Sequence, residues 1–94
     1  MKKLITLVAV LAATGAQAEQ DICSAYGSLS AEAMRVRHAG VPLSQALSAS
    51  EDEFVRAVLR EAYSRPRMST DRGIERSVQD FRNDVELACY EAIQ

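Results

Sequence analysis

Residues 74–92 read IERSVQDFRNDVELACYEA, and apolar residues recur in this stretch with the spacing of one face of an α-helix. The steps between them are four, three, four, three and four residues, at Ile74, Val78, Phe81, Val85, Ala88 and Ala92. The opposite face carries charged residues such as Glu75, Arg82 and Glu86. This stripe predicts a long amphipathic helix whose apolar face other helices must cover.

A second helix is predicted upstream, and Pro66 separates it from the first. Proline disfavours helical geometry in the residue before it, so the upstream helix ends there, and Ser69 or Thr70 caps the next one. Ser50 and Glu53 match the Ser-x-x-Glu capping box at the start of the upstream helix. Its predicted buried face comprises Phe54, Val55, Val58, Leu59 and Ala62, with Tyr63 at the edge.

The earliest predicted helix covers residues 21–39, with Asp21 as its cap and Gly40 as the glycine that ends it. Its apolar face comprises Ile22, Tyr26, Leu29, Ala33 and Val36. The following VPLSQALS predicts a short helical turn that Pro42 opens, with Leu43 and Leu47 facing the core. Because no segment alternates with the period of a strand, the sequence predicts an all-α fold, a small three- to four-helix bundle.

Two cysteines, Cys23 and Cys89, lie in the first and last of these helices. In an exported domain an even number of cysteines indicates a disulfide. This one closes a loop of about 67 residues, and the chain-entropy model gives it on the order of 4 kcal/mol of stabilisation. The bond predicts that the start of the first helix lies beside the end of the last, as an antiparallel pair. Metal or thiol chemistry is the alternative, but one histidine and no Cys-x-x-Cys motif argue against it.

Residues 1–18 have the three parts of a secretory signal peptide. Two lysines supply the positive start, LITLVAVLAA the apolar part, and Ala-Gln-Ala the cleavage pattern between Ala18 and Glu19. Ten apolar residues are too few to span a bilayer, which needs roughly 20. We therefore expect one helical domain, residues 19–94, in a bacterial periplasm or secreted, without stable membrane insertion after cleavage.

The charge and the motifs of the mature chain disfavour several functions. Without residues 1–18 it has nine arginines, no lysine and thirteen acidic residues, so its formal charge is 9 − 13, or −4. A net acidic domain disfavours nucleic-acid binding. Phosphate-binding loops, nucleophile elbows and zinc motifs are missing, so the sequence predicts no enzyme, no catalytic residue, no cofactor and no metal site. His38 ends a helix, where it can interact with the helix dipole.

Arginines cluster around the Pro66 corner and form the candidate functional patch. They can assemble into a site for an anion or a partner protein beside the N–H groups of the last helix. The alternative is internal pairing, such as Glu53 with Arg56 or Glu61 with Arg65. The candidate residues are Arg56, Arg60, Arg65, Arg67, Arg72 and Arg76.

Four stretches together carry a resemblance: the Cys-x-x-Tyr opening, GVPLSQAL, AYSRPRMST and FRNDVELACYEA. The chain resembles a group of small exported proteins of proteobacteria and their phages or prophages. That resemblance implies export and a shared helical fold but no mechanism. A second similarity, to HdeA-type acid-stress chaperones, is one of format alone: small, all-α and held by one disulfide. Their lysine-rich ends are missing here, and no motif residue can be matched.

The leading functional hypothesis is a non-enzymatic periplasmic interaction protein that docks on another envelope protein. A more specific form of this hypothesis is a phage-linked factor that modulates an envelope or lysis protein. The alternatives are a periplasmic stress chaperone and a small inhibitor of a hydrolase, for which SRPRMST is the candidate loop. The oligomeric state does not follow from the sequence.

Overall fold

The computed structural model describes residues 22–93, which form four helices and no strand. The helices are an N-terminal helix over residues 22–38, α2 (Leu43–Ser48), α3 (Glu53–Ser64) and α4 (Asp71–Ala92). The predicted all-α fold is therefore confirmed for this part of the chain. The predicted signal peptide, its cleavage site and the Asp21 cap lie outside the described residues.

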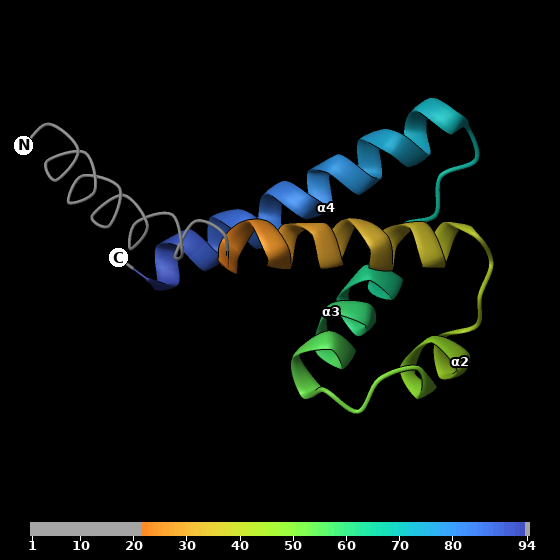
Figure 1. Cartoon of the computed structure of the whole chain (residues 1–94). Helices are drawn as coiled ribbons and strands as arrows, with labels where there is room; N and C mark the ends of the chain where they lie inside the picture. Colours follow the sequence, from red (N-terminus) through yellow and green to blue (C-terminus); the bar gives the residue numbers. More distant parts are fainter. Residues whose placement is uncertain (1–21, 94) are drawn as a thin grey trace, which may run out of the picture.

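The N-terminal helix is the central element of the molecule. In Figure 1 it runs between α4 on one side and α2 with α3 on the other. A disulfide joins Cys23 to Cys89 with their Cα atoms 5.5 Å apart, so the start of the N-terminal helix lies beside the end of α4. The predicted disulfide and the antiparallel pairing that follows from it are both present.

Two faces of the N-terminal helix pack against other helices, although the sequence indicated only one. The face toward α4 includes small residues. Gly27 lies so close to α4 that an added Cβ would be 2.6 Å from Glu86 Cγ. Ser30, fully buried, donates its hydroxyl to the carbonyl of Tyr26. The predicted apolar stripe lies on the other face and is incompletely covered, and Ile22 is 50% exposed. Gly27 and Ser30 carry no hydrophobic signal, and the prediction also left out Ala31 and Met34, which are buried.

The ends of the helices follow local chemistry, with one correction. Gly40 adopts φ +85° and ends the N-terminal helix, with Val41 N–H donating to the Val36 carbonyl as in a Schellman motif. Thr70 caps α4 by accepting from the N–H of Gly73. The predicted Ser50 cap of α3 is wrong. Asp52 is the cap, because its carboxylate accepts the first free N–H groups of α3 at 2.8 and 3.1 Å.

The core is small and rich in alanine, and it lies where α2, α3 and the first half of α4 meet the N-terminal helix. Its buried members are Ala31, Ala33, Met34, Ala46, Val58, Leu59, Ala62, Val78 and Phe81. Four predicted core residues are not covered: Ile22 is 50% exposed, Phe54 is 42% exposed, and Ala88 and Ala92 are also exposed. The reason is geometric, since α4 extends past the start of α3 and no other helix within residues 22–93 covers its last turns on that side (Figure 1).

Candidate functional site

An apolar groove of about 540 Å³ lies between α3 and α4, over the first turns of the N-terminal helix. Phe54 and Val58 of α3 form one wall, and the other wall is a stripe of Phe81, Val85, Ala88 and Ala92 on α4. Large side chains remain open to solvent at its rim: Ile22, Phe54 and Ile93 are 42–50% exposed. Apolar surface gathered in one concave place is typical of a binding site, whereas single exposed apolar residues are not.

The groove is held open by contacts at the end near the start of the N-terminal helix. The Cys23–Cys89 disulfide fixes α4 to that helix, and Cys89 itself lines the groove. The rings of Tyr26 and Phe54 are in contact, with their centroids 4.4 Å apart and their planes tilted by 37°. This geometry suits an aromatic pair and holds the first turn of α3 over the N-terminal helix. The walls are therefore preformed.

Arg65 lies at the opposite end of the groove and joins α3 to α4. Its guanidinium stacks over the ring of Phe81 at 4.5 Å and donates to Asp84 at 2.7 Å, with Glu61 at 3.8 Å. The Nε atom of Arg65 is buried and has no hydrogen-bond partner among residues 22–93. Planar stacking on an aromatic ring combined with carboxylate pairing is specific to arginine. The predicted patch residue Arg65 is thus a structural bridge.

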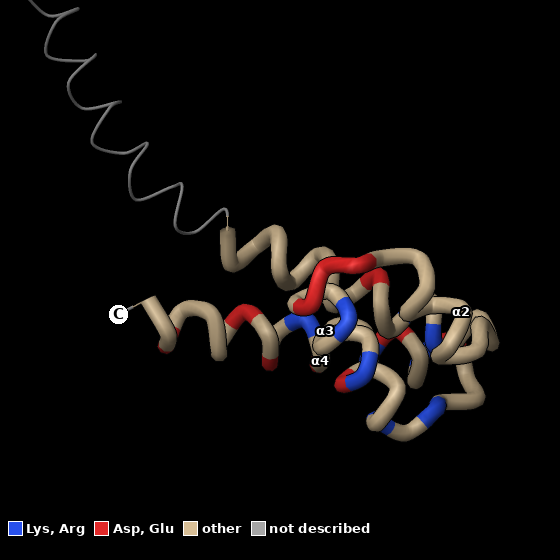
Figure 2. Tube along the Cα trace, turned by 90° about the horizontal axis from the view of Figure 1, so that it is seen from below, with Lys and Arg blue, Asp and Glu red and all other residues tan. Residues whose placement is uncertain are grey.

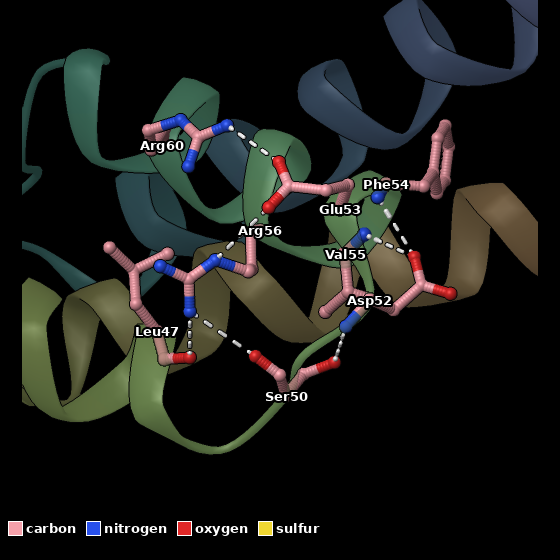
Figure 3. A network of polar contacts seen from close by, with 8 residues as sticks. All are labelled: Leu47, Ser50, Asp52, Glu53, Phe54, Val55, Arg56 and Arg60. Atoms are coloured by element: carbon pink, nitrogen blue, oxygen red, sulfur yellow. Dashed lines mark hydrogen bonds and ion pairs between the residues drawn. The ribbon is translucent and has the colours of Figure 1, made fainter.

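Arg56 and Arg60 are also engaged within the molecule, as Figure 3 shows. Arg56 donates from one nitrogen to the carbonyls of Leu47 and Ser50, at 2.7 and 3.3 Å, where the chain leaves α2. Glu53 lies 3.7 Å from Arg56 and 3.9 Å from Arg60. Carbonyls at the end of a helix lack partners within it, and Arg56 supplies one. The predicted six-residue patch does not form as a single site, because Arg56 holds the α2–α3 connection and Arg60 lies beside Glu53 on α3.

The other three candidates, Arg67, Arg72 and Arg76, are exposed. Within residues 22–93 none of them forms an ion pair. Arg72 and Arg76, one turn apart on α4, line a second pocket of about 490 Å³ at the corner, together with Thr70, Ser77 and Asp80. Arg65 lines both this pocket and the apolar groove. Figure 2 shows acidic and basic residues interspersed along the chain.

The corner between α3 and α4 is fixed by residues of the N-terminal helix that the sequence did not single out for this role. Arg37 donates from Nε to the Arg65 carbonyl at 3.0 Å and stacks on the ring of Tyr63. His38 accepts from the N–H of Met68 at Nε2, and its Nδ1 donates to the Met34 carbonyl. Because a carbonyl only accepts and an amide N–H only donates, these bonds require the neutral Nδ1–H tautomer. His38 therefore anchors the corner.

Tyr63 completes the same anchor by donating its hydroxyl to the carbonyl of Val41. A tyrosine at the edge of a core usually packs its ring against apolar side chains and forms a hydrogen bond with its hydroxyl. Pro66 and the residues after it remain exposed, but their backbone is tied to the N-terminal helix on either side. These structural contacts account for much of the sequence of this corner.

Among residues 22–93, no group of three or more His, Cys, Asp or Glu side chains is placed to hold a metal ion. In the same part of the chain no helix combines the length and the apolar character needed to cross a membrane. Comparison with known proteins finds no matching family model, no similar curated protein and no similar solved structure. The groove and the corner pocket are therefore interpreted from their own chemistry.

Proposed function

We propose that this chain is an exported, non-enzymatic helical protein that binds an amphipathic helix of another envelope protein in the groove between α3 and α4. The observation that carries the proposal is that several apolar residues lining that groove are exposed: Ile22, Phe54, Ala88, Ala92 and Ile93. From Phe81 to Ala92 the α4 wall is about 16 Å long at 1.5 Å per residue, which accommodates three turns of a bound helix. Amphipathic helices bind such grooves through anchors at i, i+3 or i+4, and i+7.

A second copy of the chain fits the groove less well than a different partner. A symmetric dimer needs a self-complementary surface, so one copy would have to offer a convex apolar face. Among the described residues, the large apolar side chains exposed outside the groove are Met68 and Leu87, which belong to different elements. Neither provides a continuous face, and this favours an occupant from another protein.

The setting of the proposed function rests on the sequence. Residues 1–18 resemble a signal peptide, and disulfides persist mainly in oxidising compartments such as the periplasm. The resemblance to small exported proteins of proteobacteria and their phages supports export, and export makes a protein of the cell envelope an accessible partner.

Photo-crosslinking in cells tests the proposal. A photo-reactive amino acid replaces Phe54 in the exported protein, and Leu87 serves as the matched control, because it is 58% exposed but does not line the groove. We expect one covalent adduct from position 54 and none from position 87. Mass spectrometry of the adduct should place the crosslink in an amphipathic helix of a single protein. Adducts of equal yield at both positions, an adduct with the chain itself, or no adduct at position 54 would contradict the proposal.

A stress chaperone is the second candidate, and the same open groove favours it, since chaperones bind clients through exposed apolar surface. The two functions predict different adducts: one partner for an interaction protein, many unrelated proteins for a chaperone. Suppression of client aggregation at pH 2 to 3, lost when Phe54 is replaced by aspartate, would support the chaperone.

A further inference from the structure

We propose that the bound helix carries carboxylates at the end that passes Arg65, and that these carboxylates pair with Arg72 and Arg76. This inference rests on the proposed function and specifies the chemistry of the partner. The observation that motivates it is that the apolar groove and the corner pocket adjoin at a shared residue, Arg65. A partner long enough to leave the groove at this end meets the corner pocket next.

A single exposed ridge on α4 connects the two sites. Residues four apart along a helix form a row inclined by about 26° to its axis, and helices pack along such rows. The row that starts at Arg76 continues through residues lining the corner pocket and then the groove, and all its members are exposed: Arg76, Asp80, Asp84, Ala88 and Ala92. It is about 24 Å long at 1.5 Å per residue, so a helix of roughly 16 residues spans it.

The charges along this ridge differ between its two ends. Alanines at the end near the disulfide let another helix approach closely. In the middle, Asp84 is engaged by Arg65 at 2.7 Å, and Glu61 also lies near Arg65, so this acidic pair is partly compensated. At the corner, Asp80 is the one carboxylate that lines the pocket with Arg72 and Arg76. It forms an ion pair with neither of them. The corner therefore has an excess of positive charge in a chain that is acidic overall.

The position of Arg72 and Arg76 strengthens their attraction for an anionic group. Both lie in the first two turns of α4, which starts at Asp71. The first turn of a helix carries a partial positive charge, which adds to that of the guanidinium group of Arg72. Two arginines one turn apart present several N–H donors to carboxylates on a neighbouring helix. An acidic end on the partner satisfies these donors, whereas a basic end is repelled.

Designed peptides test the inference directly. The probe is an 18-residue amphipathic helix with leucines along one face and two glutamates at one end, and the comparison peptide carries two lysines at that end. Binding to the exported protein is measured by fluorescence anisotropy at low and at high salt. Two exposed ion pairs predict that the glutamate peptide binds about fivefold more tightly at low salt and that salt removes most of the difference.

Variants of the protein identify the arginines responsible. Arg76→Glu should remove the preference for the glutamate peptide, and Arg72→Glu combined with it should reverse the preference in favour of lysine. Arg60→Glu is the matched control, since Arg60 is also an exposed helical arginine but lines neither site. It should leave the preference unchanged.

The outcomes separate this inference from the proposed function. If Phe54→Asp abolishes binding but both peptides bind equally to the unaltered protein, the groove proposal stands and the acidic-end inference is wrong. An equal loss of preference in the Arg60 variant would also overturn the inference, because it would show a general charge effect. If neither peptide binds, or if Phe54→Asp has no effect, the groove does not accept an amphipathic helix and both proposals fail.

Discussion

The two halves of α4 carry the same apolar spacing but lie in different surroundings. In the first half, Val78 and Phe81 are fully buried against the N-terminal helix and α3. In the second half, Ala88 and Ala92 occupy equivalent positions of the stripe and are exposed in the groove. Helical periodicity thus identifies which face of a helix is apolar. What covers that face depends on where the other helices end.

Different interactions hold the two halves in place. Packing holds the first half, through a core that includes Phe81. The second half packs against the N-terminal helix at Gly27 and Glu86, and it is also held by the covalent bond between Cys23 and Cys89. A groove that binds a partner, as proposed, cannot be stabilised by filling it, and a disulfide beside the groove is a physical substitute for packing.

Removal of the disulfide should have the largest effect. For the double variant Cys23→Ser with Cys89→Ser, the chain-entropy model predicts a loss on the order of 4 kcal/mol in the free energy of unfolding. This is comparable to the whole net stability of a domain this small, about 5–10 kcal/mol. Circular dichroism during thermal unfolding should show a melting temperature far below that of the oxidised protein. An unchanged melting temperature would mean that packing, and not the disulfide, holds the second half of α4.

Two phenylalanines give the next largest difference. Phe81→Ala removes a fully buried ring and should lower the free energy of unfolding by about 3 kcal/mol. Phe54→Ala removes a ring that is 42% exposed and should cost less than half as much, yet it should be the variant that weakens partner binding. Urea denaturation monitored by circular dichroism gives both values. Equal losses of stability would show that Phe54 belongs to the core and that the groove is not a free surface.

Much of the fold could be predicted because its signals are local. Pro66 and Gly40 break helices through their own backbone chemistry, and the two cysteines had one possible intramolecular pairing. The choice of Asp52 over Ser50 as the cap was not predictable, since both residues suit the position and the difference is decided by where the first turn begins. Cap assignments from sequence are for this reason less certain than the existence of the helix.

The site was harder to predict than the fold. The sequence grouped six arginines into one patch, but their surroundings depend on residues distant in the chain: the carbonyls of Leu47 and Ser50 take up Arg56, and Phe81 and Asp84 take up Arg65. The groove left no direct signal, because an apolar residue at helical spacing predicts burial whether or not a neighbour reaches it. Only the arrangement of α3 relative to α4 shows that Phe54 is uncovered.

Arg65 marks the boundary between the covered and the uncovered half of α4, and replacing it should have the smallest of these effects. Arg65→Ala removes a cation–π contact and a partly exposed ion pair, each worth no more than about 1 kcal/mol, so we expect a loss of about 1 kcal/mol in the free energy of unfolding. Arg67→Ala is the matched control, because Arg67 is exposed and unpaired within residues 22–93. It should leave urea denaturation unchanged.

Arg65→Lys should restore only part of the loss, since lysine keeps the charge but cannot stack its head group on Phe81 while pairing with Asp84. Full recovery with lysine would show that charge alone links α3 to α4, and equal losses for both alanine variants would show that Arg65 is no bridge.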